Sequence, residues 1–131
     1  MIRFELPYPP SINHYYRRVG PRTLISREGR AYRGHVASAL AGLGLEPFDG
    51  PLEVQLDVYP PDKRRRDVDN VQKALLDSLQ QAGVYRDDSQ IKRLVTEMLD
   101  VVPGGKVAVT IGRYQRHDAQ DEREILAPDR G

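Results

Sequence analysis

Residues 52–82 hold a strand pattern followed by a helix pattern, and this pair constrains the fold more than any other feature. The alternating apolar positions are Leu52, Val54, Leu56 and Val58. Alternation of this kind predicts a strand with one buried face, ended by two prolines at 60–61. A one-sided apolar stripe follows at Val68, Val71, Leu75, Leu79 and Ala82. That spacing predicts a helix over about 68–82, with Gly83 at its C-terminal cap.

Weaker patterns complete the predicted elements. Residues 2–6, 22–25, 91–102 and 106–114 read as strands, and 11–20 reads as a polar and aromatic loop. A second helix begins after Ser26, a favoured N-cap, and ends at Gly42 or Gly44. Its apolar stripe is Tyr32, Val36, Leu40 and Leu43.

These elements predict a small α+β domain with a mixed or antiparallel sheet and two main helices. Residues 103–105, Pro-Gly-Gly, predict a hairpin between the last two strands. We assign residues 1–114 to one domain and 115–131 to a polar, flexible C-terminal tail.

Composition excludes several classes of protein. The chain has no cysteine, which excludes disulfides and thiolate zinc sites. No segment resembles a membrane span, and the first residues lack the apolar stretch of a signal peptide. With 39% hydrophobic residues the chain can bury a modest core. We therefore expect a soluble, intracellular protein.

The charged residues are strongly clustered. The net charge is only +1, yet residues 63–66 are Lys-Arg-Arg-Arg and are followed at once by Asp67 and Asp69. Cations hold polyanions, and closely spaced carboxylates hold hard divalent cations. A phosphodiester substrate needs both. Arginines also gather between positions 17 and 33, which supports a nucleic-acid partner.

Asp67 and Asp69 can converge only if Asp67 lies outside the helix. Two interior helical residues at i and i+2 point about 200° apart. Because aspartate is a favoured N-cap, we predict Asp67 at the cap and Asp69 in the first turn. Lys73 follows Asp69 by four residues. This spacing fits an ordinary ion pair, and it also fits a cation set beside metal-binding carboxylates.

A third acidic position lies further along the chain, at Asp87 or Asp88. A helix over 68–82 is about 22 Å long, and the extended segment 83–88 returns at most about 17 Å. A site that unites Asp88 with Asp67 and Asp69 is therefore tight within one chain, and it is the arrangement we favour. The alternative is that Asp88 comes from a partner subunit.

Such an oxygen-only set suits Mg²⁺, with Mn²⁺ as a substitute. The alternative is that Asp67 and Asp69 are solvated acids at a helix start, and that Arg64, Arg65 and Arg66 are a solubilising run. The histidines, His14, His35 and His117, lack the spacing of metal ligands. Tyr15 and Tyr16 can stack on bases, although packing against the sheet is the favoured interpretation.

Three segments together resemble the RusA family of Holliday-junction endonucleases. They are residues 6–17 (LPYPPSINHYYR), residues 64–73 (RRRDVDNVQK) and residues 82–90 (AGVYRDDSQ). The likeness covers most of positions 6–114. The most specific element is Arg-Asp-x-Asp-Asn-x-x-Lys with the downstream Asp-Asp.

The resemblance implies a RusA-like fold and a homodimer that binds four-way DNA and nicks two strands symmetrically with Mg²⁺. It places the metal carboxylates at Asp67, Asp69 and Asp88, and an essential lysine at Lys73. The predicted DNA-binding residues are Arg64, Arg65, Arg66, Asn13, Arg17 and Asn70. The expected location is cytoplasmic, at the nucleoid during recombination and repair.

Three rival functions stay open. One is a broader metal-dependent nuclease for flaps or other branched DNA. The second is a non-catalytic module that binds DNA junctions and keeps the acids for structure. The third is a protein-interaction domain without salt-dependent DNA affinity.

Overall fold

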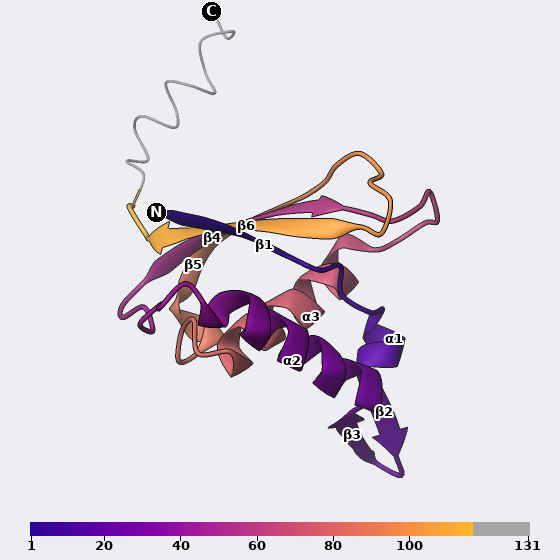
Figure 1. Cartoon of the computed structure of the whole chain (residues 1–131). Coiled ribbons are helices and arrows are strands. Elements are labelled where there is room, and N and C mark those ends of the chain that lie inside the picture. Colours follow the sequence, from indigo (N-terminus) through magenta and orange to yellow (C-terminus); the bar gives the residue numbers. More distant parts are fainter. Residues whose placement is uncertain (117–131) are drawn as a thin grey trace, which may run out of the picture.

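A four-stranded sheet forms the centre of the domain (Figure 1). The computed structural model describes residues 1–116. The strands are β1 (Ile2–Leu6), β4 (Leu52–Tyr59), β5 (Ile91–Met98) and β6 (Lys106–Arg113). Their order is β1-β6-β4-β5, with β4 and β5 parallel and the other pairs antiparallel. This confirms the predicted α+β class with a mixed sheet.

The predicted hairpin between the last two strands is wrong, because β4 lies between β5 and β6. The segment after β5 follows β4, since Leu99 N donates to Val58 O at 2.7 Å and Val102 N donates to Pro60 O at 2.9 Å. The chain then crosses over before β6 begins. A Cβ atom on Gly105 would lie 2.9 Å from the Tyr8 side chain, so glycine permits this close crossing. The strand that was predicted to reach residue 102 ends at Met98.

Two long helices cover one face of the sheet, α2 (Arg27–Ala41) and α3 (Val68–Gln81) (Figure 1). Both were predicted, and Ser26 is the N-cap of α2, accepting a hydrogen bond from Gly29 N at 2.9 Å. Two predicted core positions are wrong, because Leu43 is 50% exposed beyond the end of α2 and Val68 is 39% exposed in the first turn of α3. Among residues 1–116, no helix has the length and hydropathy that a membrane crossing needs.

Residues 11–20 are not the loop that was predicted. They form a short helix, α1 (Ile12–Tyr15), and strand β2 (Tyr16–Val19), which pairs with β3 (Arg22–Ile25). This β2–β3 ribbon projects from the body near the start of α2 (Figure 1). A Cβ atom on Gly29 would lie 2.3 Å from Tyr15 O, so only glycine lets α2 pass this close to the end of α1. The start of the ribbon is thereby anchored beside the first turn of α2.

The core lies between the sheet and the helices. Fully buried side chains come from the strands, from both helices, from α1 and from the segment after α3; the largest are Tyr15, Tyr85, Leu52, Leu56, Leu75, Leu79 and Ile111. The apolar stripe of α3 is therefore used for packing, as predicted, and its polar face is turned away from the core.

Candidate active site

The first turn of α3 presents the two predicted carboxylates in the predicted way. Asp67 is the N-cap residue with extended backbone (φ −87°, ψ 132°), and Asp69 lies in the first helical turn. The Asp67 side chain makes no capping hydrogen bond. Within residues 1–116 neither carboxylate forms an ion pair. Both sets of oxygens therefore remain available to a ligand at the positive end of the helix dipole.

Lys73 lies one turn further along α3 and is held by an aromatic ring. Its Nζ atom lies 5.4 Å from the centroid of the Tyr16 ring, a cation–π distance. The Tyr16 ring in turn meets the Tyr15 ring edge-on, with centroids 4.8 Å apart. Since no ion pair joins Lys73 to Asp69 among the described residues, the simple i,i+4 pair is not the arrangement seen here.

A groove of about 320 Å³ runs along the polar face of α3. Its lining residues are Tyr16, Asp69, Gln72, Lys73, Leu76, Asp77, Gln80 and Asp88. Two of the three predicted metal ligands and the predicted lysine therefore border one groove. Leu76, half-buried, is the apolar centre of this otherwise polar surface.

Asp77 also lines the groove, but its charge is already matched. Arg33 Nη2 of α2 lies 2.7 Å from Asp77 Oδ2, and both side chains are about three-quarters buried. The Tyr15 hydroxyl donates to the same carboxylate oxygen. Burial, followed by this hydrogen bond, raises the pKa of Tyr15 to about 12, so Tyr15 stays a neutral donor. Asp77 thus ties α1, α2 and α3 together and is a poor candidate for a metal ligand.

Asp88 lies at the other end of α3, in a short 3₁₀ turn, η1 (Asp88–Gln90). Its backbone N–H donates to Gln80 Oε1 at 3.1 Å. The neighbouring Asp87 carboxylate is used for capping, because it accepts the Ser89 N–H at 2.8 Å. That bond holds the pKa of Asp87 below its ordinary value. Asp88, which lines the groove, is therefore the better placed of the two acids for a ligand.

One chain does not bring the three predicted ligands together. Asp67 and Asp69 lie at the N-terminal end of α3, whereas Asp88 is tied to Gln80 near its C-terminal end. Eleven residues of helix separate Asp69 from Gln80, which is about 16 Å. Within the described part of the chain, no three acidic or histidine side chains lie close enough to hold one metal ion. The same-chain arrangement that we favoured from the sequence is therefore not formed.

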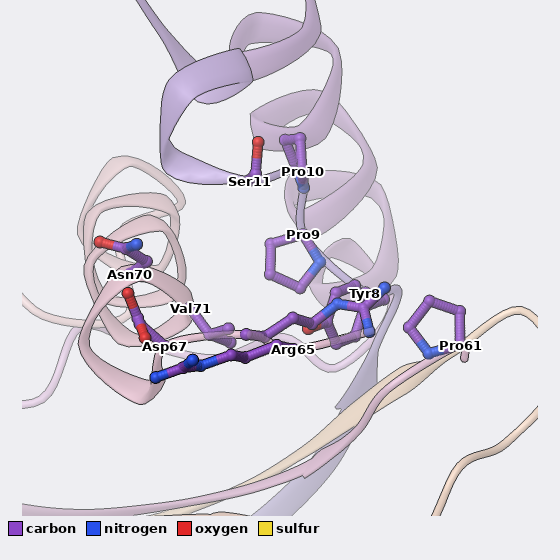
Figure 2. Close-up of a pocket in the computed structure, with 10 residues that line it drawn as sticks. Tyr8, Pro9, Pro10, Ser11, Pro61, Arg65, Asp67, Asn70 and Val71 are labelled. Carbon is purple, nitrogen blue, oxygen red and sulfur yellow. The ribbon is translucent and has the colours of Figure 1, made fainter. Parts of the chain in front are cut away.

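Asp67 faces a second, larger cavity of about 540 Å³ on the other side of the first turn (Figure 2). Its lining residues are Tyr8, Pro9, Pro10, Ser11, Pro61, Arg65, Arg66, Asp67, Asn70 and Val71. Of the predicted DNA-binding residues, Arg65, Arg66 and Asn70 thus lie beside Asp67. The walls come from the segment after β1 and from the loop before α3.

The three arginines before Asp67 differ in their surroundings. Arg66 Nη1 lies 2.8 Å from Asp62 Oδ1, and its guanidinium stacks over the Tyr8 ring at 5.5 Å. It also donates to two loop carbonyls, so Arg66 organises the loop. The Arg64 side chain is 86% exposed, and Arg65 is also exposed. Arg64 and Arg65 are therefore better placed than Arg66 to hold a backbone phosphate.

The remaining predicted DNA-binding residues, Asn13 and Arg17, are exposed on α1 and β2 and do not line either cavity. Sequence reasoning missed Tyr16 as the partner of Lys73, Gln80 as the anchor of Asp88, and Ser11 as part of a cavity wall. Residues 6–17 are one of the segments that carry the family resemblance, so the sequence did mark this segment as functional. The spacing of its residues does not specify these contacts. His117 and the predicted tail beyond Arg116 lie outside the described residues.

Comparisons with known proteins identify the family of the chain. The family model for Endodeoxyribonuclease RusA matches residues 7–112. A crossover junction endodeoxyribonuclease of Enterobacteria phage 82 is 43% identical over 107 residues, covering 81% of this chain and 89% of the relative. The crossover junction endodeoxyribonucleases of Escherichia coli K12 and Shigella sonnei are each 42% identical over 110 residues, with the same coverage. The chain belongs to the RusA endodeoxyribonuclease family.

Proposed function

We propose that this protein is a metal-dependent endodeoxyribonuclease that resolves Holliday junctions by paired nicks during recombination and repair. The observation that carries the proposal is the start of α3. There, the carboxylates of Asp67 and Asp69, which form no ion pair within residues 1–116, lie between a groove with Lys73 and a cavity with Arg65. The similarity to crossover junction endodeoxyribonucleases supports the same activity.

The donor set fits a hard divalent cation. Asp67, Asp69 and Asp88 offer only oxygen, which suits Mg²⁺ or Mn²⁺. When bound, the ion would supply charge neutralisation and an activated water for phosphodiester hydrolysis. Exposed Arg64 and Arg65 would hold the DNA backbone, and Lys73 would stabilise the charge that develops on the scissile phosphate or on the leaving oxygen. Tyr16 would keep the Lys73 ammonium at this position.

The separation of Asp88 from Asp69 supports a homodimer with shared sites. In a two-fold dimer, the same surface of each subunit faces its copy. If two α3 grooves meet in antiparallel orientation with the axis near Leu76, the N-terminal end of one helix faces the C-terminal end of the other. Asp67 and Asp69 of one subunit would then meet the Asp88 carboxylate of the other. Two such sites match the two equivalent strands of a four-way junction.

A cleavage assay on synthetic DNA tests this function. We expect Mg²⁺-dependent nicking of a four-way junction at paired positions, with much weaker nicking of a flap and of linear duplex. Asp69→Asn should abolish nicking and leave junction binding intact. Equal cleavage of flap and junction would favour a broader nuclease. Junction binding without cleavage in Mg²⁺ or Mn²⁺ would contradict the enzymatic function.

A further inference from the structure

The cavity beside Asp67 has an apolar floor and a polar rim. Pro9 and Val71 are buried at its base, with the half-buried Tyr8 beside them. Ser11, Arg65 and Asn70 are exposed around its edge, as Figure 2 shows. Clefts with apolar walls and a few polar groups are typical of sites for organic rings. A phosphate group would lose hydration against such a floor, so it suits the rim rather than the base.

We propose that this cavity receives one unstacked nucleobase of the junction, next to the phosphate that is cut. The inference rests on the proposed nuclease function. The proline rings and Tyr8 would cover the faces of the base, and the Asn70 amide and the Ser11 hydroxyl would reach its polar edge. Both side chains can donate and accept hydrogen bonds. Arg65 would hold the phosphate attached to the same nucleotide.

Three features of the site favour a base over other occupants. Its volume of about 540 Å³ leaves room for a purine or pyrimidine without rearrangement of the walls. The cavity opens beside Asp67, so a base within it would belong to a nucleotide near the proposed metal site. Finally, bases at the crossover of a four-way junction lose stacking partners at lower cost than bases within a duplex.

An abasic scan combined with a cavity-filling variant tests the proposal. Fixed four-way junctions would carry one abasic nucleotide, moved stepwise through the positions around the crossover. Binding would be measured without divalent metal for the wild-type homodimer, for Ser11→Trp and for Asn70→Ala. Ser38→Trp is the matched control, because Ser38 is an exposed serine on α2 that lines neither cavity.

We expect Ser11→Trp to weaken binding of the intact junction about tenfold, as is typical for the loss of one stacked base. At one abasic position next to the nick, wild type and Ser11→Trp should bind equally well, since no base then needs the cavity. Asn70→Ala should also bind the intact junction more weakly than wild type and bind equally well at that abasic position. Its cleavage should depend less on which base occupies that position. Ser38→Trp should match wild type on every junction.

A constant ratio between wild type and Ser11→Trp at every abasic position would overturn the proposal, because the cavity would then serve another occupant, such as the partner subunit. That result leaves the nuclease function untouched if wild type still cuts the intact junction. Failure of wild type to cut any junction would overturn the nuclease function and the base site together.

Discussion

The two ends of α3 carry acidic side chains in opposite circumstances. At the N-terminal end, Asp67 caps the helix with its backbone only, and its carboxylate makes no capping bond. At the C-terminal end, side-chain oxygens of Gln80, Asp87 and Gln90 accept backbone hydrogen bonds and fix the turn that carries Asp88. The N-terminal end presents carboxylate oxygens with few internal contacts. The C-terminal end presents a single carboxylate, on a turn that hydrogen bonds hold in place.

If the site is shared between subunits as proposed, each subunit holds two halves of a site rather than a complete one. A folded chain could bring three acids together, but they would repel one another unless a cation were present. With the halves at opposite ends of α3, the isolated subunit avoids this repulsion. The full donor set would form only where two subunits meet in the dimer.

The largest expected effect is loss of a metal ligand at either end. Asp69→Asn and Asp88→Asn should each lower the cleavage rate by at least about a thousandfold, since each removes charge from one shared site. Asp87→Asn is the matched control. Asparagine is also a good cap, so this variant should stay within about threefold of wild type. Single-turnover cleavage of a fixed junction measures all three. Full activity of Asp88→Asn would remove the C-terminal end from the site.

Lys73→Ala should come next, with a fall in cleavage of about a hundredfold, typical of the loss of one group that stabilises transition-state charge. Junction affinity should change little, because one ammonium among many cations contributes modestly to binding. Cleavage and binding would be measured on the same junction at one salt concentration. A matching loss of affinity and rate would instead make Lys73 a residue for DNA binding.

The arginines before α3 should separate by their surroundings. The log of the binding constant falls as the log of the salt concentration rises. Arg65→Ala should make this slope less steep by about one, the value for one phosphate contact. Arg66→Ala should instead destabilise the loop, because the guanidinium is bonded to Asp62 and covers Tyr8. Salt titrations of junction binding test the prediction for Arg65→Ala, and thermal unfolding tests the prediction for Arg66→Ala. An unchanged slope for Arg65→Ala would contradict its role.

Asp77 should behave as a structural acid in the middle of the groove. Asp77→Asn should lower the free energy of unfolding by about 1.5–3 kcal/mol, because it removes a charge-assisted bond to Arg33. Its cleavage rate per folded dimer should fall far less than that of Asp69→Asn. Denaturant unfolding and cleavage of the same preparation distinguish the two roles. A stable but inactive variant would place Asp77 among the catalytic groups.

The smallest effect is expected for Tyr16→Leu. Leucine keeps an apolar side chain beside Tyr15 but removes the ring that faces Lys73. A cation–π contact at a partly exposed site contributes about 0.5–1 kcal/mol, which corresponds to a fall in cleavage of about two- to fivefold. Tyr16→Phe, which retains the ring, should restore the rate. Equal loss in both variants would assign the effect to the hydroxyl.

Much of the fold followed from residue periodicity, because β1, β4, α2 and α3 each bury one regular face. The predicted cap at Asp67 is confirmed, since it followed from the angular spacing of helical residues. The order of the strands could not be predicted in this way. A Pro-Gly-Gly turn is compatible both with a hairpin and with a crossover, and the choice depends on which neighbours β4 accepts on its two edges.

The site was predictable in its parts but not in its assembly. Asp67, Asp69 and Lys73 lie close in sequence, so helix geometry relates them directly. The position of Asp88 depends on Gln80, whose amide binds the turn at the far end of the helix. The Tyr16 contact with Lys73 depends on the packing of α1 against α2 at Gly29. Such contacts between distant segments leave no periodic signal in the sequence.

Mixed dimers test the shared site most directly. Asp69→Asn and Asp88→Asn subunits, each inactive alone, would be co-expressed with different tags, and the mixed dimer would be purified through both tags. If each site takes Asp69 from one subunit and Asp88 from the other, one of the two sites in the mixed dimer contains no substitution. The mixed dimer should then nick one strand of a junction at about the wild-type rate per intact site. No cleavage by a purified mixed dimer that still binds the junction would contradict a site built from two subunits.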